Sequence, residues 1–148
     1  MTSDTKIAIA SDHGGFVLKA ELLQWLKSQG YDVLDLGADS EESSDYPDFG
    51  AKMAQAIIGG QVNKGVLICG TGIGISIAAN RFSEVRCAVC HDVTTSYLAR
   101  AHNDANVLAV GARTTGPETV KDILKTFLET DFDAKDRYVR RKEKLGAL

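Results

Sequence analysis

The 148-residue chain contains little cysteine and little proline, and it has no large excess of charge of one sign. Its three cysteines are too few, and odd in number, for a disulfide framework. Its two prolines and the absence of any low-complexity stretch leave no place for a linker. A strong charge of one sign is also missing, because 17 Lys and Arg stand against 20 Asp and Glu, a net charge of −3. This balance argues against a dedicated nucleic-acid-binding protein, which would be strongly basic.

Long apolar segments are missing as well. No apolar run approaches the roughly 20 residues of a membrane span, so we expect no contact with a membrane. The polar start MTSDTK and the short apolar strip at residues 7–10 do not form a signal-peptide core. We therefore expect a cytoplasmic protein whose cysteines stay reduced.

Short apolar runs do occur, and they alternate with amphipathic ones along the whole chain. The pattern predicts strands at 6–10, 31–36, 65–69, 86–90 and 106–110, and helices at 16–29, 48–58, from a glycine loop to about 82, 92–102 and 117–128. A polar loop occupies residues 37–47. Continuously apolar strands separated by helices are typical of a parallel sheet covered on both faces. We predict an α/β fold, with one doubly wound, Rossmann-like domain over residues 1–148 and a five-stranded parallel sheet.

The positive charge gathers at the C-terminal end. Residues 134–148 contain six basic and two acidic residues, +4, which leaves 11 basic and 18 acidic, −7, for residues 1–133. This segment is either a solvated charged helix or a basic arm that reaches an anionic group. On a helix Arg137 and Arg141 lie one turn apart, so both can grip one phosphate.

Polar groups follow the predicted strands, where ligands sit in doubly wound folds. The first strand leads into Ser11-Asp12-His13-Gly14-Gly15, the third into Cys69 and a glycine loop, the fourth into His91-Asp92 and the fifth into Gly111-Ala112-Arg113. The helix after the fourth strand ends in His102-Asn103-Asp104. We expect these groups to gather near one rim of the sheet.

The glycine loop Gly70-Thr71-Gly72-Ile73-Gly74 allows three interpretations. A dinucleotide fingerprint would need a third glycine at Ile75, although Asp92 lies at about the right distance for the acidic residue of that motif. A cysteine phosphatase would need an arginine at the same position, and no G-K-[ST] follows for a P-loop. In the third interpretation, backbone N–H groups at the helix start form an anion nest.

In the third interpretation, Cys69 is the residue that would act as a base. A thiol at the lip of such a nest favours its thiolate form. A thiolate base beside N–H donors is suited to removing a proton next to a carbonyl, because the nest stabilises the enediolate oxygen. Cysteine is also a common small core residue, but the position at a strand end favours chemistry here.

Two other patterns carry less weight. Cys87-Ala88-Val89-Cys90-His91 matches haem-attachment and redox motifs, but residues three apart in a strand point to opposite faces, so the sulfurs are not expected to pair. The three histidines show no zinc-ligand spacing. Of these, His13 and His102 are candidates for proton transfer during opening of a sugar ring.

Four segments together resemble the B-type ribose-5-phosphate isomerases, within a wider family that includes allose-6-phosphate and galactose-6-phosphate isomerases. They are Ser11 to Gly15, Asp45-Tyr46-Pro47, Cys69 to Ser76 with Ala78-Ala79-Asn80, and His102 to Asn106. The resemblance runs over essentially the whole chain with the motifs in the family's order. One branch has a glutamate at the place of Ile75, and with Cys69 this chain resembles the cysteine branch.

The resemblance implies a role for each matched residue. Cys69 would be the general base that moves the proton between C1 and C2, assisted by Thr71. The enediolate would be held by the backbone of the loop, namely Gly70, Gly72, Ile73 and Gly74. Asp12 and His102 would open the sugar ring and transfer protons between the oxygens. Asn103 and Tyr46 would position the sugar. The phosphate would be bound by His13, Arg113, Arg137 and Arg141.

The resemblance also implies partners. The enzyme would be a homo-oligomer, a dimer or a dimer of dimers, with a site between two subunits, so that His102, Asn103 and some arginines come from the partner. No metal and no organic cofactor is implied. The expected substrate is ribose 5-phosphate, interconverted with ribulose 5-phosphate in pentose phosphate metabolism. A six-carbon sugar phosphate is the alternative, and a non-catalytic nucleotide-binding module is a further one.

Overall fold

The computed structural model describes residues 6–148 of the chain. Most of the polar N-terminal stretch, on which part of the signal-peptide argument rests, lies outside the described residues. At the centre is a five-stranded, all-parallel sheet, as the sequence predicts. The strands are β1 (Lys6–Ser11), β2 (Asp32–Asp35), β3 (Lys64–Cys69), β4 (Cys87–Val89) and β5 (Val107–Gly111), in the order β2-β1-β3-β5-β4.

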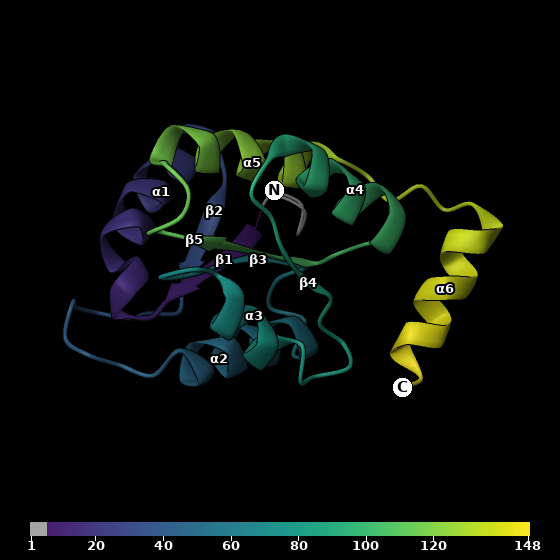
Figure 1. The fold of residues 1–148 in the computed structure, drawn as a ribbon, viewed down its shortest axis with the longest axis horizontal. Coiled ribbons are helices and arrows are strands. Elements are labelled where there is room, and N and C mark those ends of the chain that lie inside the picture. The colour runs from purple at the N-terminus through teal and green to yellow at the C-terminus, as the bar shows by residue number, and fades with distance from the viewer. Residues whose placement is uncertain (1–5) are drawn as a thin grey trace.

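Helices cover both faces of this sheet (Figure 1). On one face lie α1 (Phe16–Ser28), α4 (Val93–Asn103) and α5 (Pro117–Glu129), and on the other lie α2 (Tyr46–Ile58) and α3 (Ile73–Ala79). A short 3₁₀ turn, η2 (His13–Gly15), links β1 to α1. The layers confirm the predicted doubly wound α/β architecture. Among residues 6–148, no helix is both long and apolar enough to span a membrane.

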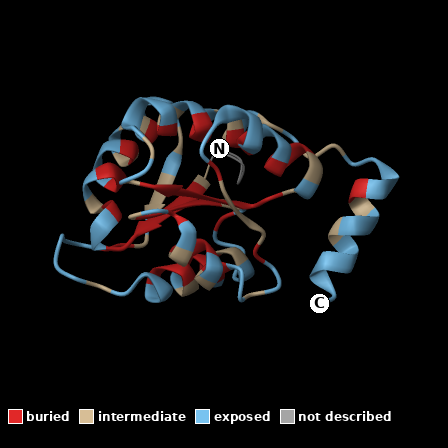
Figure 2. Ribbon diagram, in the orientation of Figure 1, coloured by how far each residue is buried: buried red, intermediate tan, exposed pale blue. Residues whose placement is uncertain are grey.

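The three central strands, β1, β3 and β5, are the most deeply buried part of the molecule (Figure 2). Along β1 the side chains alternate, because successive residues of a strand point to opposite faces. Ile7 and Ile9 enter the core beneath α1 and α5, whereas Ala8 and Ala10 enter the core against α2. Each face therefore has its own hydrophobic core, which explains why the interior positions of the central strands are apolar without alternation.

Two helix boundaries differ from the prediction for local reasons. The helix α2 begins at Tyr46, two residues earlier than expected, because Pro47 suits the first helical turn. The helix α3 ends at Ala79 and not near residue 82. There the Asn80 side chain turns to the backbone of Cys87, accepting its N–H at 2.8 Å and donating to its carbonyl at 2.9 Å.

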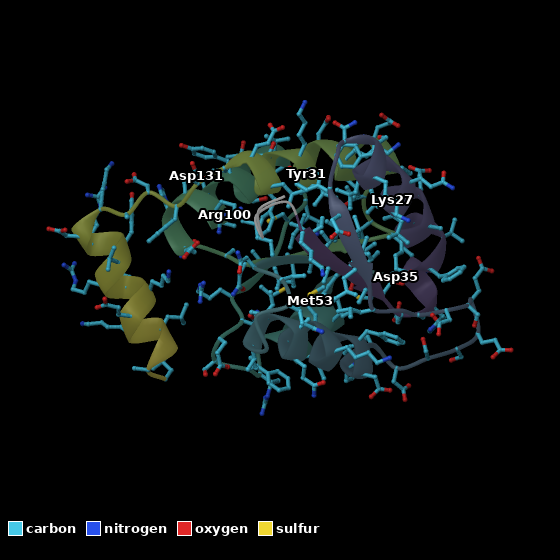
Figure 3. All side chains as sticks on the ribbon, turned by 180° about the vertical axis from the view of Figure 1, so that it is seen from behind. Lys27, Tyr31, Asp35, Met53, Arg100 and Asp131 are labelled. Atoms are coloured by element: carbon cyan, nitrogen blue, oxygen red, sulfur yellow. The ribbon has the colours of Figure 1, made fainter. Side chains whose placement is uncertain are left out.

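The basic C-terminal segment forms α6 (Asp136–Gly146), which lies beyond the β4 edge of the sheet, past the end of α4 (Figure 1). Its surface is almost entirely exposed, and Tyr138 is its one buried residue. The chain reaches α6 through a connection held to α4, where Arg100 Nε donates to the carbonyl of Thr130 at 3.0 Å. Figure 3 shows Arg100 close to this connection, in which Asp131 lies.

Candidate active site

The first part of the site lies at the carboxyl edge of the sheet, where β1 and β3 end side by side. Ser11 pairs with Ile68 in the register of these two strands, so Asp12 and Cys69 follow at the same edge. Asp12 is only 7% exposed, and its carboxylate accepts the N–H of Gly14 at 2.9 Å. The chain therefore turns around a buried carboxylate next to the end of β3.

Cys69 is the last residue of β3 and is 5% exposed. Its sulfur accepts the backbone N–H of Gly72 at 3.1 Å. Gly72 makes this turn at φ +80°, the left-handed region that favours glycine. The hydroxyl of Thr71 accepts the N–H of Ile73 at 3.1 Å. The loop thus aims one N–H donor at the cysteine sulfur, which is part of the cradle that the sequence predicts.

Three more predicted residues surround this loop. Arg113, exposed after β5, is anchored by its N–H, which donates to the Gly70 carbonyl at 2.9 Å. Tyr46 lies against the start of α3, because a Cβ atom on Gly74 would meet its ring at 2.8 Å. His13 is exposed in η2. These contacts place the loop residues, Asp12 and all three surrounding side chains at one edge of the sheet.

His13 is oriented by a reciprocal pair of hydrogen bonds to the polar loop. Its backbone N–H donates to the Ser44 hydroxyl at 3.0 Å, and the Ser44 N–H donates to His13 Nδ1 at 3.1 Å. Since Nδ1 accepts, the ring carries its proton on Nε2. The loop at residues 37–47 is therefore tied to the site through Ser44.

His102 and Asn103 lie at the opposite edge of the sheet, so the expectation of a single rim within one chain is wrong. The helix α4 starts just after β4 and returns the chain to the beginning of β5. A helix that joins parallel strands must run back along the sheet, so its last residues lie at the amino edge. Cys69 pairs with Gly111 at the far end of β5.

His102 belongs to a second cluster, which α6 completes. Its ring stacks on that of Tyr138 with centroids 4.5 Å apart, and its Nε2 lies 3.2 Å from the Tyr138 hydroxyl. Arg137 donates to the same hydroxyl at 3.1 Å. A cavity of about 210 Å³ adjoins this group and is lined by His102, Asn103, Tyr138, Arg141, Lys142 and Leu145.

Asp104 joins the end of α4 to α6. It adopts φ +48°, and its carboxylate accepts hydrogen bonds from Arg100 at 2.8 Å and from Lys142. Burial alone would raise its pKa, but the hydrogen bonds from Lys142 and Arg100 outweigh that effect and hold the pKa below its ordinary value. Reasoning from sequence named Asp104 in the polar trio at the end of α4 but gave it no role, and it missed Tyr138, because their partners lie up to 38 residues away.

Cys87 and Cys90 are separated as predicted. Cys87 packs with the core against α2, and Cys90 lies in the core beneath α4 and α5. All three cysteines are free, and burial raises the pKa of both Cys87 and Cys90. Within residues 6–148, no cluster of three or more His, Cys, Asp or Glu side chains is placed to hold a metal ion.

The two positions on which the nucleotide-binding alternative depends have structural roles in this fold. Ile75, at the position of the motif's third glycine, is fully buried in the core beside α2. Asp92 caps the start of α4, where its carboxylate accepts the backbone N–H of Thr95 at 2.7 Å and the Thr95 hydroxyl at 2.9 Å. These hydrogen bonds lower the pKa of Asp92. The carboxylate is thus committed to a helix cap.

Comparison with known proteins identifies the family of the chain. Residues 7–145 match a family model described as Ribose/Galactose Isomerase. Ribose-5-phosphate isomerase B of Escherichia coli is 44% identical over 143 residues, 97% of this chain and 95% of that protein. The structure of Clostridium thermocellum ribose-5-phosphate isomerase B superimposes with a TM-score of 0.94 at 47% identity, covering 96% of this chain and 95% of that one.

A more distant relative is the LacB subunit of galactose-6-phosphate isomerase from Clostridium acetobutylicum. It is 38% identical over 126 residues, 85% of this chain and 73% of that protein. The range matched by the family model includes the residues of both clusters described above. The protein therefore belongs to the ribose/galactose isomerase family and is a sugar-phosphate isomerase that interconverts an aldose and a ketose.

Proposed function

We propose that the enzyme interconverts ribose 5-phosphate and ribulose 5-phosphate through an enediolate, with Cys69 as the general base. The observation that carries this proposal is the geometry at Cys69, whose nearly buried sulfur accepts the Gly72 N–H at 3.1 Å. The N–H donor and the start of α3 both place partial positive charge beside the sulfur, which suits a base that works as a thiolate.

The reaction begins with a proton next to a carbonyl. The thiolate of Cys69 removes the C2 proton of the open-chain aldose, and the electron pair moves to the carbonyl oxygen to form the enediolate. The Cys69 thiol, whose proton can exchange with solvent, then protonates C1, and a proton moved between the two oxygens gives the ketose. Backbone N–H groups from Gly70 to Gly74 stabilise the enediolate oxygen, with help from the Thr71 hydroxyl.

The remaining residues bind and open the sugar. Asp12 accepts the C1 hydroxyl proton of the ring form, and His102 supplies a proton to the ring oxygen as the C1–O bond breaks. Tyr46 and Asn103 position the sugar. The phosphate is bound by His13, Arg113, Arg137 and Arg141.

This assignment requires two chains. His102, Asn103, Arg137 and Arg141 belong to the end of α4 and to α6, whereas Cys69 lies at the carboxyl edge of the sheet. In a two-fold dimer each subunit would present its α4 end and α6 to the carboxyl edge of its partner. We propose a homodimer, alone or as half of a tetramer, with two shared sites.

The size of the sugar is the open choice within this proposal. The relationship to the LacB subunit of galactose-6-phosphate isomerase keeps a six-carbon substrate as the alternative. The loop at residues 37–47, tied to His13 through Ser44, borders the site and is the segment most suited to measuring sugar length. Comparison of kcat/KM on ribose 5-phosphate, allose 6-phosphate and galactose 6-phosphate decides between them. A higher value for either hexose phosphate would replace the pentose assignment.

Replacement of the proposed base tests the chemistry. We expect Cys69→Ala to lower kcat for ribose 5-phosphate by at least about a hundredfold, because general-base catalysis contributes that much. Incorporation of solvent deuterium at C1 of ribulose 5-phosphate, followed by NMR, should fall equally. The matched control is Cys90→Ala, a buried cysteine that follows β4, which β5 separates from β3. Turnover of Cys69→Ala at the wild-type rate, or strong inhibition of the wild type by a chelator, would contradict the mechanism.

A further inference from the structure

Tyr138, which has no role in the function proposed above, contacts two residues that have one. Tyr138 is the buried residue of α6, 9% exposed, on a helix that is otherwise surrounded by solvent. Its ring lies between two groups, stacked on His102 at 4.5 Å and covered by the Arg137 guanidinium, whose central carbon is 4.6 Å from the ring centroid. Tyr138 therefore lies directly between two residues of the proposed site.

One of the two hydrogen bonds at the Tyr138 oxygen has a direction fixed by chemistry. Arg137 has only donors, so the phenolic oxygen accepts from it at 3.1 Å. The single phenolic proton is then free to point at His102 Nε2, 3.2 Å away. An Nε2 atom that accepts a hydrogen bond leaves the imidazole proton on Nδ1.

We propose that Tyr138 is a positioning residue that holds His102 as the Nδ1–H tautomer and thereby prepares it to open the sugar ring. This inference rests on the proposed role of His102. As Nδ1 gives its proton to the ring oxygen and the C1–O bond breaks, Nε2 takes the phenolic proton, so the imidazole stays neutral. The Arg137 guanidinium compensates the charge left on the Tyr138 oxygen, and Asp12 receives the C1 hydroxyl proton.

The histidines of the site then carry opposite tautomers. The Ser44 N–H donates to His13 Nδ1, which places that ring's proton on Nε2. In His102, under our proposal, Nε2 accepts from the Tyr138 hydroxyl 3.2 Å away and the proton is on Nδ1. His13 is therefore an internal reference for any measurement of the His102 tautomer.

Substitution Tyr138→Phe tests the inference because it removes the hydroxyl and keeps the stacked ring. We expect kcat for ribose 5-phosphate to fall at least about tenfold with little change in KM or in Tm. The ¹⁵N resonances of His102 should shift from the Nδ1–H toward the Nε2–H tautomer, while those of His13 stay unchanged. The matched control is Tyr97→Phe, which removes the hydroxyl of an exposed tyrosine on α4.

A second measurement separates ring opening from isomerisation. Ribulose 5-phosphate has its C5 hydroxyl esterified, so it forms no furanose ring. Solvent deuterium exchange at its C1 should therefore proceed in Tyr138→Phe at the wild-type rate. An unchanged kcat, an unchanged His102 tautomer, or exchange reduced as much as kcat would each overturn the inference. If the proposed function itself fails, the wild type shows neither turnover nor exchange, and the tautomer measurement still tests Tyr138.

Discussion

At the scale of single residues, Gly72 shows how closely the site depends on its backbone. It sits at φ +80°, and a Cβ atom there would lie 2.9 Å from the carbonyl carbon of Val110. The same residue donates its N–H to the Cys69 sulfur. Any side chain at this position has to move either β5 or the loop that carries the proposed base.

We expect Gly72→Ala to lower both stability and activity. The positive φ alone costs an alanine about 1 kcal/mol, and the contact with Val110 adds a further 1–3 kcal/mol, approximately. The control is Gly30→Ala, because Gly30 has φ +93° with nothing within 4 Å of an added Cβ. Denaturant unfolding and turnover of both variants measure the difference. Equal destabilisation of the two variants, with full activity in Gly72→Ala, would contradict this account.

At the scale of elements, the placement of α6 depends on a few polar contacts. No broad apolar face ties it to the sheet, since only Tyr138 is buried. The Lys142 ammonium binds the Asp104 carboxylate, which Arg100 holds from the other side. This salt bridge between α4 and α6 should therefore control where Arg137 and Arg141 lie relative to His102.

We expect Lys142→Met to raise KM for ribose 5-phosphate several-fold and to lower the free energy of unfolding by roughly 1 kcal/mol. Lys142→Arg keeps the positive charge and should restore much of the affinity. The matched control is Lys144→Met, two residues along α6, which should leave KM unchanged. If Lys142→Met and Lys144→Met have the same KM, the contact with Asp104 does not position the arginines.

The salt bridge between Asp104 and Lys142 also makes the stability of the protein depend on pH. The folded-state pKa of Asp104 lies below its ordinary value of 3.8, so its contribution to stability is complete above that value and is lost as pH falls through the folded pKa. The stability difference between wild type and Asp104→Asn should be constant from pH 5 to 7, roughly, and should shrink below about pH 4. Chemical denaturation across this range measures it. A difference that grows toward low pH would have the wrong sign.

At the scale of the whole molecule, the two clusters are the central feature. Cys69 and His102 lie at opposite edges of one sheet, so a complete site needs a second chain under our proposal. The overall charge of −3 conceals an uneven distribution, because residues 134–148, which include α6, carry +4, whereas residues 1–133, which include the loop at Cys69, carry −7. Such complementary charge favours association between copies of the chain.

Mixed dimers test the shared site. Cys69→Ala and His102→Ala chains, co-expressed with different affinity tags and purified through both, should form dimers in which one of the two sites is intact. We expect about half of the wild-type turnover, well above that of either variant alone. The control is a mixed dimer in which both chains carry Cys69→Ala. Activity no greater than that of the parent variants would show that each site is built from one chain.

The sequence by itself determined the parallel sheet, the glycine loop and the position of Cys69 at a strand end. Apolar periodicity and glycine positions are local signals, and the carboxyl ends of parallel strands meet at one edge whatever the rest of the chain does. Only the tertiary structure decided the contact between Tyr138 and His102 and the hydrogen bond from Lys142 to Asp104. These contacts join residues 36 and 38 positions apart, and side-chain geometry over such separations follows from how helices pack and leaves no periodic trace in the sequence.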